Sequence, residues 1–85
     1  MTYRAVLTGR ALSQFRDLIA DPDAYAAIME RILQLAEAPW DAWTVPAVGD
    51  EPAHRQAEFG EHGLVSFRVD DEAESLVIFS ILWAG

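Results

Sequence analysis

Hydrophobic and polar positions divide the first part of the chain into one strand and one helix. Residues 3–8 alternate between two sides, which predicts a strand with one dry face. Apolar residues then recur at three- and four-residue intervals over residues 11–19, which is the spacing of an amphipathic helix. Thr8 precedes this helix, where its hydroxyl can accept a hydrogen bond from the first turn. The helix is expected to end near Ala20.

A second helix is predicted to begin at the Asp-Pro-Asp sequence of residues 21–23. The first aspartate can cap the helix, proline suits the first helical position, and an acidic side chain is stabilised near the positive end of a helix. Apolar residues keep the helical spacing from Tyr25 to Ala36, and Pro39 ends the helix. Because so few residues join the two helices, we expect a nearly antiparallel hairpin that packs on one sheet.

The second half of the chain predicts a loop and then a hairpin of two strands. Residues 39–52 contain Trp40, Trp43 and several prolines without a sustained period, which predicts an ordered loop anchored by its tryptophans. Residues 54–59 and 64–70 have the alternation of strands, and the turn between them has two glycines.

The last predicted strand, residues 75–83, is apolar almost throughout. Such a strand is covered on both faces, at the centre of a sheet or beneath a partner. Strict alternation places Leu76, Ile78 and Leu82 on one side and the remaining large residues on the other: Val77, Phe79, Ile81 and Trp83. The whole pattern predicts one α+β domain over residues 1–85, with an N-terminal strand, a two-helix hairpin and a three-stranded antiparallel meander in one sheet.

Composition narrows the functions that this domain can have. A chain of 85 residues suffices for one domain, and the absence of cysteine excludes disulfides and thiolate chemistry. The net charge is −8 and all six cations are arginines, so a nucleic acid would be repelled rather than attracted. No segment approaches the roughly 18 apolar residues of a membrane span, so we expect a cytoplasmic protein.

The order of elements and two local patterns resemble the RelE/ParE toxin superfamily. Residues 64–72 read Leu-Val-Ser-Phe-Arg-Val-Asp-Asp-Glu, and this is similar to the family's strand rich in arginine and aromatics that ends in Val-Asp-Asp-Glu. In both cases a long apolar strand follows. Residues 3–8, ahead of a helix that contains Phe15, also look like the family. The resemblance spans essentially the whole chain and implies a RelE/ParE-like fold.

The resemblance also suggests where catalysis would take place. RelE-type toxins cut messenger RNA on the ribosome, which requires a base, an acid and cations that hold the phosphate. In this interpretation Glu58 is the base, His54 or His62 is the acid, and Arg55 or Arg68 holds the phosphate. The alternative is that these are solvated strand and turn residues, whose ion pairs contribute only about 0–1 kcal/mol each.

Several features favour protein binding over catalysis. The chain has no lysine, and Leu64 stands where the family usually has an arginine, so the ribonuclease site is expected to be degenerate or absent. ParE-type toxins act by binding gyrase. The predicted function is therefore a toxin-like protein of a type II toxin–antitoxin pair that binds proteins. The alternatives are a non-toxic interaction domain or homodimer and a ribosome-dependent mRNA endoribonuclease.

The resemblance implies an antitoxin-like partner that covers apolar surface. Because the chain is acidic, we expect that partner to carry basic residues, or to be a second copy of the chain; nucleic acid is expected only by way of the ribosome. The candidate contact residues are apolar: Ile78, Leu82, Trp83, Trp40 and Trp43. Alternatively, the loop with the two tryptophans folds back over this surface. No cofactor and no metal are predicted, since the two histidines lack a third ligand.

Overall fold

The computed structural model describes residues 2–40, 45–46 and 53–84. Two helices and five strands follow one another along the chain: β1 (Arg4–Leu7), α1 (Gly9–Leu18), α2 (Pro22–Glu37), β2 (Val45–Pro46), β3 (His54–Phe59), β4 (Gly63–Asp70) and β5 (Ser75–Trp83). The predicted order of one strand, a helical hairpin and a meander is confirmed. The segment expected to be a loop, residues 39–52, contains the two-residue strand β2.

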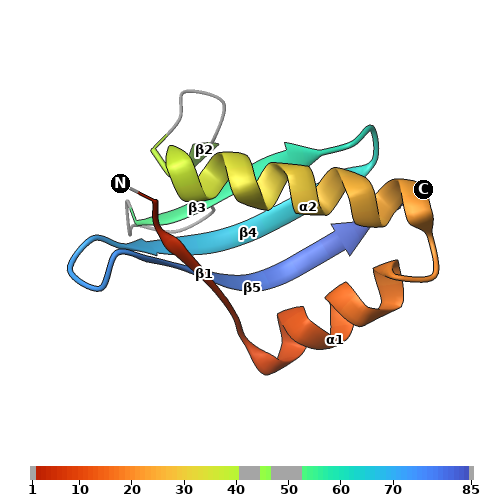
Figure 1. Ribbon diagram of the computed structural model, residues 1–85, viewed down its shortest axis with the longest axis horizontal. Helices are drawn as coiled ribbons and strands as arrows, with labels where there is room; N and C mark the ends of the chain where they lie inside the picture. The colour runs from red at the N-terminus through yellow and green to blue at the C-terminus, as the bar shows by residue number, and fades with distance from the viewer. Residues whose placement is uncertain (1, 41–44, 47–52, 85) are drawn as a thin grey trace.

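All five strands belong to one mixed sheet in the order β1-β5-β4-β3-β2 (Figure 1). β1 runs parallel to β5, with Arg4 beside Ser75 and Leu7 beside Ile78, and every other pair of neighbours is antiparallel. β5 therefore lies between β1 and β4, which confirms the interior position predicted from its apolar sequence. β2 is short and pairs only with Gln56 and Arg55 of β3.

Both helices begin at the predicted caps. The Thr8 hydroxyl accepts a hydrogen bond from the Ala11 N–H at 3.3 Å, and Asp21 Oδ1 accepts bonds from Asp23 N–H and Ala24 N–H at 3.2 Å each. Caps of this kind typically contribute about 1 kcal/mol. The helical part of α1 ends at Leu18, two residues before the expected end. Neither of the two described helices is long and apolar enough to cross a membrane.

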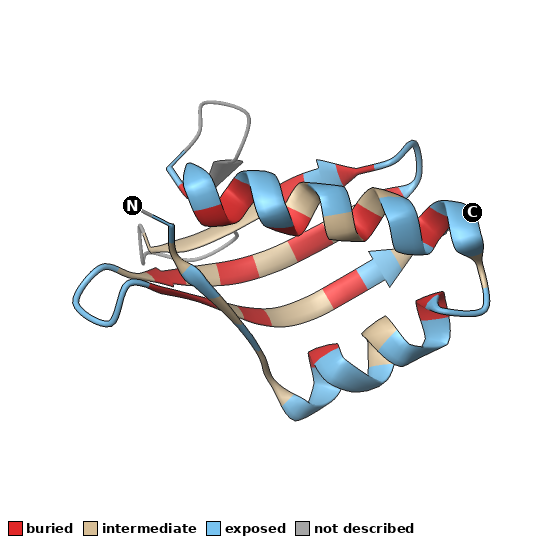
Figure 2. Ribbon diagram, viewed as in Figure 1, coloured by how far each residue is buried: buried red, intermediate tan, exposed pale blue. Residues whose placement is uncertain are grey.

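Both helices pack on one face of the sheet, and no described helix packs on the other face. The buried residues of α1 and α2 lie on the sides turned toward the strands (Figure 2). Together with one side of the sheet they form a single core, whose largest fully buried side chains are Phe67, Ile28, Leu35, Leu76, Ile78 and Val65. On β4 every second residue is buried, so the alternation predicted for this strand is confirmed.

A β-bulge in β5 overturns the strict alternation expected for this strand. Phe67 pairs with Ile78 but Ser66 pairs with Ser80, which leaves Phe79 as an extra residue opposite β4. An extra residue shifts every following side chain to the other face. Ile81 is therefore buried with Ile78 on the helix face, while half-exposed Leu82 lies on the opposite face. The prediction that grouped Leu82 with Ile78 was wrong for this reason.

Replacing Ile28 by alanine should destabilise the protein by about 2–5 kcal/mol, because Ile28 is fully buried and the substitution leaves a cavity. The matched control is Leu33→Ala on the same helix, where the side chain is 63% exposed and the change should stay within about 0.5 kcal/mol. Urea unfolding followed by circular dichroism measures both values. Equal effects of the two substitutions would contradict the described packing of α2.

Candidate functional site

The face of the sheet opposite the helices gathers most of the candidate functional residues. We call it the open face, and its described side chains come from β1, β3, β4 and β5: Arg4, Val6, His54, Gln56, Glu58, Leu64, Ser66, Arg68, Asp70, Val77, Phe79, Ser80 and Leu82. Apart from the bulge at Phe79 and Ser80, these residues alternate along each strand with residues on the helix-facing side, most of which pack into the core. The sheet therefore displays them together without contact from the helices.

One row of the open face brings together the residues best suited to chemistry. The register places His54 opposite Arg68, Arg68 opposite Val77, and Val77 beside Val6. The His54 ring also lies against Phe79, with 5.6 Å between the ring centroids and an interplanar angle of 51°. Phe79, which alternation already places on the same side as Val77, thus provides an aromatic surface against which this histidine lies. An imidazole and a guanidinium stand side by side at one end of this row, with apolar side chains at the other.

Two further rows are weaker candidates for catalysis. Ser66 lies opposite Gln56 on one side and Ser80 on the other, which gives a neutral polar row of two hydroxyls and an amide. Leu64 lies between Glu58 and Leu82 in the next row. That row is four residues from Arg68 along β4, which corresponds to about 13 Å.

Of the five candidate catalytic residues, the structure brings only His54 and Arg68 side by side. Glu58 and Arg68 share the open face but lie in separate rows, whereas Arg55 belongs to the helix-facing side of β3. His62 lies in the exposed β3–β4 turn, where Nε2 is 3.9 Å from Glu61 Oε2 and the ring meets the edge of Trp83. Among the described residues, no group of three or more histidine, aspartate or glutamate side chains could hold a metal ion.

The candidate partner-binding residues are also distributed over different surfaces. Leu82 is half-exposed on the open face, whereas Ile78 is fully buried beneath the helices and presents no surface to a partner in this structure. Trp83 turns to the helix side and stacks on Phe59, with 5.6 Å between ring centroids. Trp40 is 45% exposed, and Trp43 lies outside the described residues.

Trp40 and Arg55 belong to a polar cluster around Asp71. Asp71 Oδ1 accepts hydrogen bonds from the Tyr3 hydroxyl at 2.6 Å and from Trp40 Nε1 at 3.3 Å. The Arg55 guanidinium lies over the Trp40 ring, 5.4 Å from its centroid, in a cation–π contact. The cluster thus joins Tyr3, just before β1, and Trp40, after α2, to Asp71 in the β4–β5 turn and to Arg55 of β3. These contacts hold Trp40 against Arg55 and Asp71; the rest of the loop predicted to be anchored by its tryptophans lies largely outside the described residues.

Of the apolar residues on the open face, sequence reasoning named Leu82 as a contact candidate but not Val6, Leu64 or Val77. Val6 and Leu82 are 40% and 50% exposed, and Val77 and Leu64 are partly exposed beside them. The alternation within β1 and β4 could have identified Val6 and Leu64. Val6 stands between Ala5 and Leu7, which pack against the core, and Leu64 stands beside buried Val65, so both point to the other face. The position of Leu82 could not be found in this way, because the bulge changes the phase of β5.

Comparison with known proteins relates this fold to bacterial toxins. No family model and no curated protein sequence matches the chain. Among solved structures, it is similar to a chain of the toxin–antitoxin complex RelBE2 from Mycobacterium tuberculosis, with a TM-score of 0.82, 22% identity, and coverage of 99% of this chain and 100% of that one. The isolated Escherichia coli RelE toxin is similar with a TM-score of 0.82 and 18% identity, over 98% of this chain and 85% of that one. A YoeB/ParE toxin from Agrobacterium tumefaciens is similar with a TM-score of 0.81 and 14% identity, over 96% of this chain and 99% of that one. The chain therefore has the fold of these toxins.

Replacing Tyr3 by phenylalanine should reduce the loss of stability at high pH. The hydrogen bond to Asp71 raises the pKa of Tyr3 in the folded protein, so the phenol of the unfolded chain ionises first. The contribution of Tyr3 to the free energy of unfolding is complete below about pH 10, the ordinary pKa of tyrosine. It is lost as the pH rises through the higher pKa of Tyr3 in the folded protein.

Urea unfolding from about pH 8 to about pH 11 measures this contribution. The free energy of unfolding should fall less steeply with pH in Tyr3→Phe than in the unmodified protein. Tyr25→Phe, which removes the same hydroxyl from the surface of α2, should leave the slope unchanged. Identical slopes in all three proteins would contradict the assigned hydrogen bond.

Proposed function

We propose that this protein is a toxin-like member of a toxin–antitoxin pair and that it acts by binding a protein. The observation that carries the proposal is the likeness of fold over nearly the whole chain to RelE and YoeB/ParE toxins. Two of the similar structures are complexes of a toxin with its antitoxin. We infer an antitoxin-like partner for this chain on the same basis.

The charges on the open face support protein binding rather than RNA cleavage. Its described side chains include two arginines, Arg4 and Arg68, and these are balanced by Glu58 and Asp70. The chain as a whole carries a charge of −8 and no lysine. A polyanionic strand is held mainly by cations that neutralise its phosphates, so this surface offers little attraction to RNA.

The apolar residues of the open face support the same conclusion. Val6, Leu64, Val77, Phe79 and Leu82 come from three neighbouring strands. Register neighbours connect Val6 to Val77 and Leu64 to Leu82. Exposed apolar surface with a polar rim is typical of protein-binding sites. The overall acidity favours a partner that carries basic residues, and a second copy of the chain is the other candidate.

Ribosome-dependent RNA cleavage is the second candidate function, and one observation favours it. His54 lies directly opposite Arg68, so a histidine that would donate a proton to a leaving oxygen stands beside a cation that would stabilise a phosphate. Glu58, the candidate base, lies in another row, about 13 Å away along the strands. A non-toxic interaction domain on the same scaffold is the third candidate.

Expression of the protein alone should arrest growth, and expression together with the product of its neighbouring gene should relieve the arrest. Arrest is expected because toxin–antitoxin pairs act through the balance between the two proteins. Colony counts after induction measure the effect, and purification of the two proteins as one complex tests the pairing directly. A folded, soluble protein that causes no arrest would instead favour the non-toxic interaction domain.

Substitutions on the open face should separate protein binding from catalysis. Leu82→Glu introduces a charge into the apolar surface and should abolish growth arrest. His54→Gln and Arg68→Gln remove the possible catalytic groups and should leave the arrest largely intact. The matched control is Leu33→Glu, because Leu33 is the same residue type and is 63% exposed against 50% for Leu82, but lies on α2.

The opposite pattern would identify the ribonuclease. If His54→Gln or Arg68→Gln abolished the arrest while Leu82→Glu retained it, the protein-binding proposal would fail. Circular dichroism of each purified variant distinguishes loss of function from loss of fold. Primer extension on transcripts from arrested cells would then detect the cuts that a ribosome-dependent nuclease makes.

A further inference from the structure

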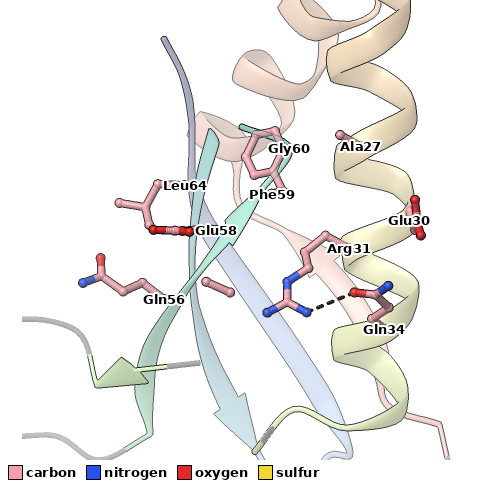
Figure 3. A pocket seen from close by; sticks show the side chains of 10 residues that line it. Ala27, Glu30, Arg31, Gln34, Gln56, Glu58, Phe59, Gly60 and Leu64 are labelled. Atoms are coloured by element: carbon pink, nitrogen blue, oxygen red, sulfur yellow. Dashed lines mark hydrogen bonds between the residues drawn. The ribbon is translucent and has the colours of Figure 1, made fainter. Parts of the chain in front are cut away.

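A groove of about 710 Å³ lies between helix α2 and strand β3 (Figure 3). The small side chains of Ala27 on α2 and Ala57 on β3 leave this space open. The groove is also lined by side chains from both faces of β3, among them Gln56, Glu58 and Phe59. Since both faces of β3 contribute, the groove runs around the outer edge of this strand, and it reaches Leu64 of β4 beside Glu58.

This outer edge has backbone groups available for pairing. The Val69 N–H donates to the Ala53 carbonyl, which shows that odd-numbered residues of β3 direct their backbone groups toward β4. Gln56 and Glu58 therefore direct theirs outward. β2 lies opposite Gln56 and Arg55, and no other described strand stands beside the outer edge at Glu58.

Arg31 supplies the one cationic side chain among the residues that line the groove. Its side chain extends from α2 into the space between the helix and β3, whereas Glu30 and Glu58 point away from it (Figure 3). Arg31 Nη1 donates to Gln34 Oε1 at 3.0 Å, and Nε is buried without a hydrogen-bond partner. No described acidic residue forms an ion pair with Arg31.

The free side of this guanidinium matches a carboxylate. Nε and Nη2 project their N–H groups in parallel, which is the geometry that binds both oxygens of one carboxylate. Gln34 occupies Nη1 and leaves that side unoccupied. A single carboxylate would neutralise the single arginine, whereas a polyanion would meet the surrounding negative charge of the chain.

We propose that the groove between α2 and β3 binds an extended segment of a partner protein that carries a glutamate or aspartate. The segment adds to the outer edge of β3 as a further strand, through the outward backbone groups of Glu58. Side chains of a strand alternate, so one side chain turns inward under α2, and its carboxylate binds Arg31. This inference stands apart from the proposed toxicity, because it concerns a binding surface and not the effect of binding.

The test is a titration of the full chain, labelled with nitrogen-15, with a capped seven-residue peptide of alternating threonine and valine that has one central glutamate. The expected result is a shift of the backbone amide signals of β3 and of the Arg31 Nε–H signal. The same peptide with glutamine in place of glutamate should bind at least tenfold more weakly.

Variants of the protein locate the site. Arg31→Gln should weaken binding of the glutamate peptide at least tenfold and remove its advantage over the glutamine peptide. Ala27→Leu, which fills the groove without changing charge, should weaken both peptides. Arg10→Gln is the matched control, because it removes the same charge from exposed α1 and should leave binding unchanged.

The proposal is overturned if the glutamate peptide leaves β3 and Arg31 unshifted at millimolar concentration, or if Arg31→Gln binds it as well as the unmodified protein. Shifts of the same β3 signals with protein concentration alone would show that a second copy occupies the groove, which also overturns it. None of these outcomes depends on growth arrest, so failure here leaves the proposed function to its own experiments.

Discussion

Burial of the β4–β5 pair beneath the helical hairpin is the interaction on which the rest of this structure depends. Phe67 and Ile78 are register neighbours at the centre of that pair, and both are fully buried in the same core as Ile28 of α2. Each large side chain buried in this way contributes about 1.5–3 kcal/mol. The two described helices cover one side of the sheet, and no described helix packs on the opposite side. Both surfaces considered for function result from this arrangement. No described helix packs on the open face, and the groove lies where α2 reaches the edge of the sheet.

A single extra residue in β5 decides which side chains the open face presents. The bulge at Phe79 keeps Leu76, Ile78 and Ile81 together in the core, although these residues do not follow strict alternation. It also turns Leu82 outward. Bulges of this kind commonly redirect side chains near functional sites. Here the bulge adds Leu82 to an open face whose histidine and nearby arginine come from β3 and β4.

Bulk charge and local charge lead to different conclusions about partners. The total of −8 favours a partner with basic residues and disfavours RNA. On the open face, however, two arginines balance two carboxylates, and in the groove Arg31 is a lone cation with an unpartnered nitrogen. One partner can satisfy both conditions if it is basic as a whole and carries one acidic residue in an extended segment. Long-range attraction then depends on the net charge, and the position of the bound segment depends on Arg31.

The sequence by itself determined the elements, because their signals are local. Thr8 and the aspartate-proline pair at residue 21 mark helix starts through contacts within one turn, and the alternation of residues 64–70 marks a strand face. The RelE/ParE-like architecture followed from the order of these elements and is confirmed by the similar structures. Only the tertiary structure decided the bulge, the placement of Glu58 and Arg68 in different rows of the open face, and the burial of Ile78. These depend on register between strands and on packing under the helices, and neither is encoded in the periodicity of a single segment.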